Sequence, residues 1–143
     1  MIGSLYLWRW AAYAGIYFLV FNFLTESKKR REKNSHFLLF GVLGAGTAVG
    51  MLGLLQYFLY PNLGNLAYLG WDPHYLRLFS TFFDPGFTGA ILVLTLILGV
   101  VLLLEGISKP RWWLILALGI NYLALALTYS RSSLLMFFVA QTV

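Results

Sequence analysis

Long apolar runs separated by short polar gaps are the feature that most limits what this chain can fold into. The runs cover residues 2–24, 37–60, 85–104, 112–129 and, more briefly, 132–143. A helix crosses about 30 Å of hydrocarbon with about 20 apolar residues, so each of the four longer runs has the length of one crossing. The sequence therefore predicts an all-α, polytopic transmembrane helix bundle that forms a single domain over residues 1–143.

Composition agrees with this interpretation and excludes several others. Apolar residues make up 60% of the chain and charged residues 10%, with a mean hydropathy of +0.78, whereas soluble domains are roughly 25% charged. The net charge of +5 is confined to gaps between apolar runs, so we expect no nucleic-acid partner. The chain has no cysteine, which excludes disulfides and thiolate chemistry.

The first and last runs raise questions about the two ends of the chain. A secretory signal peptide is the competing interpretation of residues 2–24, but a signal peptide carries its basic residues in front of the apolar run, and here they follow it. The run 132–143 reaches about half of the way across the hydrocarbon. We therefore expect a truncated fifth span and a natural protein that continues beyond Val143.

Basic residues predict the orientation of the helices. The stretch Thr25–His36 holds five of the ten basic residues and Lys109–Arg111 holds two more; we interpret both as loops that face the cytoplasm. The start of the chain, the segment Pro61–Asp84 and Arg131 then share the outer side. The Pro61–Asp84 segment, rich in turn residues and aromatics, is expected to be ordered at the membrane surface.

Small and polar residues inside the runs predict how helices pack. Gly46 and Gly50 form a GxxxG step that favours close helix contact. Asn121 and Thr95 are more often hydrogen-bonded to a neighbouring helix than part of a polar path. A small membrane interaction or assembly protein, using the glycine-rich face, is one functional hypothesis for such a chain.

Two outer-side arginines are the first candidates for function. Basic residues of membrane proteins are concentrated in cytoplasmic loops, so arginines on the outer side are unusual. Arg77 and Arg131 are therefore candidates for a functional role. Arg131 stands among serines, including Ser130, and its guanidinium fits the oxygens of a phosphate or diphosphate. The alternative is that both arginines extend to lipid headgroups.

Nearby titratable residues give weaker signals. His74 precedes Arg77 by three residues, close enough to share its face on a helix, and a histidine can act as a general base; a solvated interfacial histidine is the commoner case. Asp72 and Asp84 are too far apart in sequence to indicate a carboxylate pair or a metal site. We expect no metal and no cofactor.

Two stretches resemble the O-antigen ligase and polymerase superfamily. They are Arg77–Ala90 (RLFSTFFDPGFTGA) and Leu127–Leu135 (LTYSRSSLL). Members of that family commonly show an arginine, then a phenylalanine and an Asn-Pro-Asn-like turn opening a helix, and later a Thr-x-Ser-Arg step. The resemblance covers residues 37–143. Asp84-Pro85-Gly86 departs from the family turn, although proline suits a first helical position.

The resemblance implies an inverting, metal-independent glycosyltransferase in the cell inner membrane. It would transfer or polymerise glycan on the outer face, from an undecaprenyl-diphosphate donor to a lipid or sugar acceptor. Arg77 and Arg131 would hold the donor diphosphate, with His74 and Ser130 as candidate auxiliary residues. The family's acceptor-activating histidine lies in a later loop that His74 does not match, so no catalytic residue is assigned.

Overall fold

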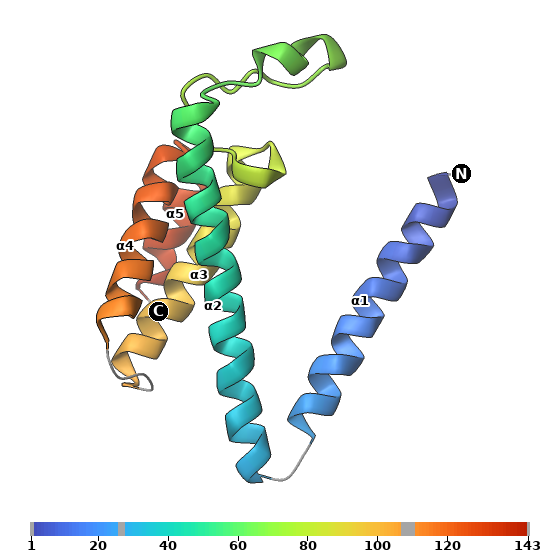
Figure 1. The fold of residues 1–143 in the computed structure, drawn as a ribbon, viewed down its shortest axis with the longest axis vertical. Coiled ribbons are helices and arrows are strands. Elements are labelled where there is room, and N and C mark those ends of the chain that lie inside the picture. The colour runs from blue at the N-terminus through green and yellow to red at the C-terminus, as the bar shows by residue number, and fades with distance from the viewer. Residues whose placement is uncertain (1, 26–27, 107–110, 143) are drawn as a thin grey trace. The chain divides into compact units, whose positions relative to one another are not determined.

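The structure, a computed structural model, describes residues 2–25, 28–106 and 111–142, and its regular elements there are all helical. In chain order they are α1 (Ile2–Leu24), α2 (Lys28–Leu59), the 3-10 helices η1 (Gly64–Leu69) and η2 (Ser80–Phe82), α3 (Pro85–Leu104), α4 (Trp112–Leu127) and α5 (Arg131–Ala140) (Figure 1). No strand occurs in these three ranges. The expectation of an all-α chain is confirmed.

Two of the described helices are long and apolar enough to cross a membrane. They are the Arg30–Leu59 part of α2, with a mean hydropathy of 2.0, and α3, with 2.8. The described apolar part of α1, Trp10–Phe23, and the helices α4 and α5 are shorter. Length and composition thus establish two candidate spans rather than the four full spans expected.

The basic stretch before the second apolar run is helical, so the interpretation of Thr25–His36 as a connecting loop was wrong over most of its length. α2 begins at Lys28 and continues through His36. Lysine, arginine and glutamate are good helix formers, so the charge that keeps this stretch out of hydrocarbon does not break the helix. Of the second expected loop, residues 107–110 lie outside the described residues.

The chain divides into two compact units, Met1–Gly41 and Val42–Val143. The first holds α1 and the first turns of α2. There the Asn34 side-chain Nδ2 donates a hydrogen bond of 3.0 Å to the Phe23 carbonyl. Thr25 closes the end of α1, because its backbone N–H and its hydroxyl both donate to the Phe21 carbonyl. The Asn34 bond therefore ties α2 to the end of α1 within this unit.

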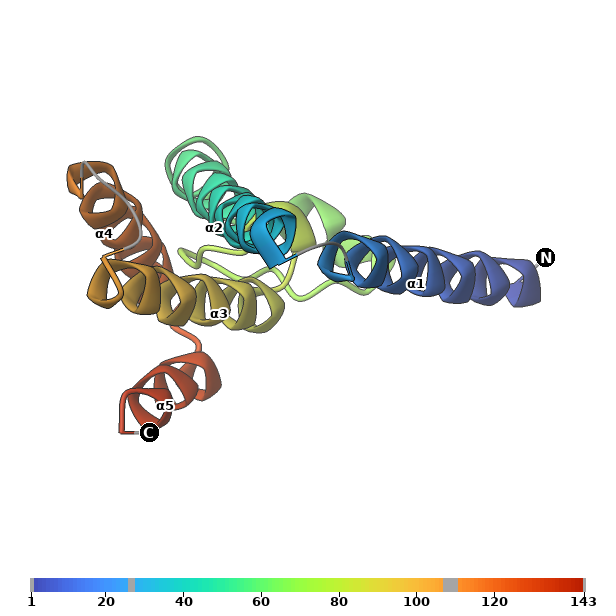
Figure 2. The same cartoon turned by 90° about the horizontal axis from the view of Figure 1, so that it is seen from below.

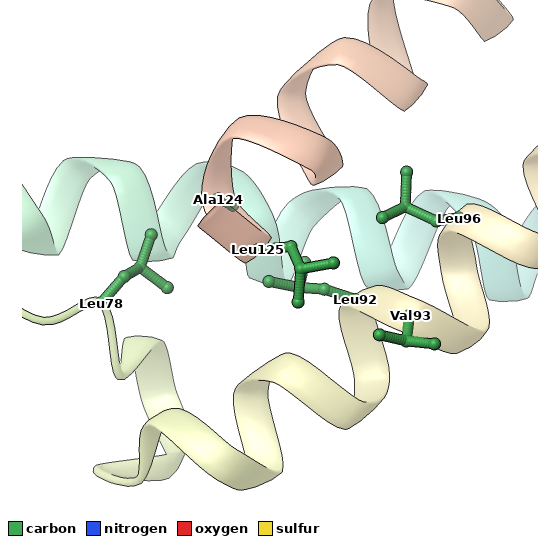
Figure 3. Close-up of a cluster of buried hydrophobic side chains, with 6 residues drawn as sticks. All are labelled: Leu78, Leu92, Val93, Leu96, Ala124 and Leu125. Carbon is green, nitrogen blue, oxygen red and sulfur yellow. The ribbon is translucent and has the colours of Figure 1, made fainter. Parts of the chain in front are cut away.

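The second unit is built around α3. This helix lies between the Val42–Leu59 part of α2 and α5, and α4 runs beside it (Figure 2). Its buried apolar core combines side chains from α3, from α4 and from the loop before η2 (Figure 3). These residues are Leu78, Leu92, Val93, Leu96, Ala124 and Leu125.

Glycines on α2 permit the close packing that the GxxxG step predicted. A Cβ on Gly46 would overlap the Thr95 side chain of α3. At Gly50 it would stand 3.1 Å from Asn121 Oδ1 and 3.3 Å from Leu92 Cδ2. Both glycines are buried, so the helix backbone itself touches its neighbours.

Buried polar side chains follow the packing expectation only in part. Asn121 Nδ2 of α4 donates to Thr47 Oγ1 of α2 at 2.9 Å and to the Ala117 carbonyl at 2.8 Å. Asn121 thus joins two helices, as expected. Thr95 instead bonds its own helix, donating to the Ile91 carbonyl at 2.7 Å, because a threonine hydroxyl reaches the carbonyl one turn back.

Apolar side chains also cover the outside of the helices in the second unit. Leu94 on α3 is 59% exposed, Ile115 on α4 58% and Phe138 on α5 62%. A helix that is apolar on its outer as well as its inner face is typical of a larger core or of a membrane span.

The Pro61–Asp84 segment contains η1 and η2, and its end is tied to α2 by hydrogen bonds. Gln56 Oε1 accepts from the backbone N–H groups of Phe79 at 3.0 Å and Ser80 at 3.1 Å. The Ser80 hydroxyl donates to the Val49 carbonyl at 2.8 Å. Leu78 and Phe79 are buried. These contacts position the residues that lead into α3.

Candidate functional site: a pocket with two arginines

An open pocket of about 590 Å³ lies where the segment before α3 meets the turn between α4 and α5. It brings together all four candidate site residues, which are His74, Arg77, Ser130 and Arg131. The lining residues are His74, Arg77, Asp84, Pro85, Gly86, Tyr129, Ser130, Arg131 and Ser132. Residues more than fifty positions apart in sequence therefore share one cavity.

Arg77 is half-buried and holds the end of α4. Its Nε donates to the Thr128 carbonyl at 3.2 Å and a terminal guanidinium nitrogen donates to the Tyr129 carbonyl at 3.1 Å. The neighbouring backbone N–H of Leu78 donates to the Leu127 carbonyl at 2.9 Å. Carbonyls at a helix C-terminus lack intrahelical partners and carry partial negative charge, so a cation is stabilising there. The N–H groups of this guanidinium that are not used in these two bonds can still donate to another acceptor.

Arg131 occupies the first turn of α5 and is exposed. Among the described residues, no hydrogen bond or ion pair involves its guanidinium. Both arginines line the same pocket, but they differ in role: Arg77 is engaged with backbone carbonyls, whereas Arg131 is available to a ligand.

Ser130 caps α5 and ties it to α3. Its hydroxyl accepts from the backbone N–H of Ser133 at 3.4 Å and lies 2.9 Å from the Ser133 hydroxyl. That hydroxyl in turn donates to the Gly86 carbonyl at 3.4 Å. Ser130 and Ser133 are buried, and an N-cap serine satisfies an otherwise unpaired helix donor. These serines fix where Arg131 begins its helix.

Asp84 caps α3 in the same way. It has an extended backbone, and its carboxylate accepts from the Phe87 N–H at 2.8 Å. Pro85 follows at the first helical position, as expected. The Asp-Pro-Gly sequence is thus a helix start, a role that asparagine in the family turn can also fill. The carboxylate also lines the pocket and offsets part of its positive charge.

His74 reaches the pocket without a helix. Residues 72–77 are not helical, so the expectation that His74 and Arg77 share a helical face was wrong. Both line the pocket nevertheless. The imidazole is 11% exposed, and its Nδ1 lies 3.5 Å from Asp72 Oδ2 with no hydrogen-bond partner.

Left-handed backbone conformations surround the pocket. His74 has a φ of 44° and Tyr129 a φ of 49°, and neither is glycine. Such conformations cost of order 1 kcal/mol each and concentrate at functional sites. At Tyr129 the bend turns the chain from α4 into Ser130 and Arg131, while Arg77 holds the carbonyl of the bent residue.

Sequence reasoning missed five of the lining residues: Tyr129, Asp84, Pro85, Gly86 and Ser132. Tyr129 and Ser132 are direct neighbours of the selected Ser130 and Arg131, so proximity in sequence was the available signal. Asp84, Pro85 and Gly86 were considered only as the turn that opens a helix, which gave no signal for a pocket. In the described residues, no group of three or more His, Cys, Asp or Glu side chains could hold a metal ion.

Comparison with protein-family models, with curated proteins and with solved structures finds no match to this chain.

Proposed function

We propose that this pocket holds the diphosphate of a polyprenyl-linked glycan donor, and that the chain carries the donor half-site of an O-antigen ligase-like or polymerase-like glycosyltransferase. The observation that carries the proposal is the convergence of Arg77 and Arg131 on one pocket of about 590 Å³. The two sequence stretches that resemble the family supply the two arginines.

Arg131 is the main ligand in this proposal. It is exposed, it lines the pocket, and a guanidinium binds phosphate oxygens through charge-assisted, bidentate hydrogen bonds. Arg77 contributes the N–H groups not used by the α4 carbonyls and positions the turn that bears Arg131. The positive end of the α5 dipole adds to the attraction for an anion.

The arginines would act on the leaving group. In an inverting transfer, the acceptor oxygen forms a bond to the anomeric carbon while the bond from that carbon to the phosphate oxygen breaks. The electron pair stays on the departing diphosphate, and the acceptor proton passes to a base. Fixed guanidinium groups stabilise the charge that develops on the diphosphate. This chemistry asks for no metal or cofactor, and the base stays unassigned.

His74 is an auxiliary residue in the same proposal. Its ring lies among the pocket residues with a carboxylate 3.5 Å from Nδ1. A neutral imidazole can accept a hydrogen bond from a sugar hydroxyl, and a protonated one can bind a phosphate oxygen. Ser130 supports the site by capping α5 and not by contacting the ligand.

The proposed setting is the inner membrane, with the chain start, the pocket and the Pro61–Asp84 segment on the outer side. The two candidate spans and the apolar outer faces of α3, α4 and α5 support membrane insertion. The basic residues at the start of α2 support the cytoplasmic assignment of that end. Four full spans and a partial fifth remain part of this proposal.

The second hypothesis, a non-catalytic membrane assembly protein, rests on the glycine-rich face of α2. That face is largely occupied within the chain. Gly46, Gly50 and Gly53 are buried against Thr95, Asn121 and Leu78, which leaves only Gly41 and Gly44 open on this helix. Because little of this glycine face is open to a partner, it gives the assembly hypothesis less support than the pocket gives the transferase hypothesis.

Diphosphate binding tests the proposal directly. The full chain, purified in detergent, would be titrated with farnesyl diphosphate and with farnesyl monophosphate as probes. We expect the diphosphate to bind more tightly, and Arg131→Ala to weaken it by about tenfold or more, since a charged hydrogen bond contributes roughly 1.5–3 kcal/mol. Arg31→Ala, an exposed arginine outside the pocket, is the matched control. Equal binding in Arg131→Ala and Arg31→Ala would refute the diphosphate role.

A further inference from the structure

Four rings lead from the pocket with two arginines to the protein surface. The ring of His74, which lines the pocket, has its centroid 6.4 Å from that of Phe79. Phe79 stacks on Phe83 at 6.3 Å, and Phe83 meets Trp71 edge to face at 5.7 Å. Phe83 also directly precedes the lining residue Asp84. We infer that Trp71 and Phe83 form a sugar subsite, which contacts the sugar attached directly to the donor diphosphate. The inference rests on the proposed function, because it assumes a diphosphate-linked glycan in the pocket.

The two outer rings of this aromatic cluster are accessible to a ligand. Phe79 is 1% exposed and belongs to the core, whereas Phe83 is 41% and Trp71 44% exposed. Phe83 also has a left-handed backbone, with a φ of 55°, a conformation that is costly for a residue other than glycine and concentrates at functional sites. Ligand sites are lined mainly by apolar and aromatic side chains with a few polar groups. A half-exposed aromatic pair next to a polar pocket fits that description.

Asp72, next to Trp71 in the chain, adds the polar contact that a sugar requires. Its side chain is 69% exposed, and its Oδ2 lies 3.5 Å from Nδ1 of His74, the first ring of the cluster. Its Oδ1 accepts from the His74 backbone N–H at 3.2 Å. The carboxylate is thus held beside the rings and has further acceptor positions for hydroxyl groups. One face of a pyranose carries C–H groups, which are attracted to the electron-rich face of an aromatic ring, and its edges carry hydroxyls.

The polyprenyl chain of the donor fits this surface less well than the sugar does. Both are joined to the diphosphate through one oxygen, so both must begin next to the pocket, and the carboxylate decides between them. A hydrocarbon packed on the cluster would remove Asp72 from water without giving it a hydrogen-bond partner, which is costly. A sugar hydroxyl donates to the carboxylate in place of water, and another can accept from the indole N–H of Trp71.

Two probes that differ in the sugar test the inference. The full chain, purified in detergent, would be titrated with farnesyl diphosphate and with farnesyl diphosphate that carries N-acetylglucosamine on its terminal phosphate. Trp71→Ala should weaken binding of the glycosylated probe about fivefold, which corresponds to about 1 kcal/mol, and should change binding of farnesyl diphosphate by less than about twofold. Trp112→Ala, a 65% exposed tryptophan at the start of α4 and outside the cluster, is the matched control and should change neither.

Asp72→Asn separates recognition of the sugar from the effect of charge. Asparagine keeps an oxygen that can accept from the His74 N–H but loses the negative charge. The loss of a charged hydrogen bond to a hydroxyl should weaken the glycosylated probe about fivefold. Electrostatics alone would tighten both anionic probes, because a negative charge near the pocket is removed. Tightening of both would therefore overturn the contact between Asp72 and the sugar. Circular dichroism would establish that all variants keep their helix content.

The outcomes for Trp71→Ala distinguish this inference from the proposed function. Equal weakening of both probes would show that the ring supports the lipid or the fold, and it would overturn the sugar subsite. An effect on neither probe, with both bound by the parent chain, would overturn the subsite and leave the diphosphate site intact. So would a parent chain that binds farnesyl diphosphate and excludes the glycosylated probe. Failure of the parent chain to bind either probe would refute the proposed function, and this inference with it.

Discussion

Arg77 Nε donates a hydrogen bond of 3.2 Å to the carbonyl of Thr128, a residue 51 positions further along the chain. This bond joins the two sequence stretches on which the functional hypothesis rests. It also gives Arg77 a structural task, because the guanidinium compensates the carbonyls at the end of α4.

Replacement of Arg77 should therefore cost stability as well as binding. Arg77→Ala removes two charged hydrogen bonds to carbonyls and should lower the free energy of unfolding in detergent by about 1.5–3 kcal/mol. Arg131→Ala, which loses no described hydrogen bond, should change it by less than about 0.5 kcal/mol. Unfolding curves of the two variants make the comparison. Equal stability of both would contradict the different roles given to the two arginines.

The serine cap of α5 makes a second prediction. Ser130→Ala removes the side chain that caps this helix and should lower stability by about 1 kcal/mol. Ser132→Ala changes an exposed neighbour that is not the cap and should have a smaller effect. Thermal unfolding of both variants in one detergent is the measurement. A larger loss in Ser132→Ala would show that the Ser130 cap is not formed.

Tyr129 tests whether the bend before Arg131 is strained. Its φ of 49° lies in the left-handed region, where a Cβ costs about 1–2 kcal/mol that glycine avoids. Tyr129→Gly and Tyr129→Ala both remove the ring, so their difference isolates the backbone. We expect the glycine variant to be more stable than the alanine variant by about 1 kcal/mol in chemical unfolding. If alanine equals or exceeds glycine, the residue is not left-handed in the native protein.

The fold class and the start of α3 could be predicted from the sequence, whereas the helical state of the basic stretch could not. Apolar runs of helix length determined the class of fold, because few other structures accommodate such runs. The start of α3 at Pro85 was readable as well, since proline at a first helical position is a local signal whose geometry does not depend on distant residues. The helical basic stretch was misread, because charge indicates exclusion from hydrocarbon and says nothing against a helix.

The arrangement of the pocket depended on distant contacts. Arg77 and Arg131 stood out as charges in an unusual place, but the bonds from Arg77 to the α4 carbonyls join segments about fifty residues apart, and no local pattern encodes them. The same holds for His74. Its place in the pocket comes from an irregular segment with left-handed residues at His74 and Leu76, conformations that non-glycine sequence does not announce.

Gly46 provides the sharpest test of the packing in the second unit. A Cβ at this position would overlap the Thr95 side chain, whereas a Cβ at Gly44, on the same helix, meets nothing within 4 Å. Gly46→Ala should therefore destabilise the chain by about 1–3 kcal/mol, the usual cost of overpacking. Gly44→Ala should be neutral or slightly stabilising, since alanine favours helix over glycine by about 1 kcal/mol. Unfolding of both variants in detergent measures the difference. Equal stability would mean that α2 does not pack on α3 through this glycine.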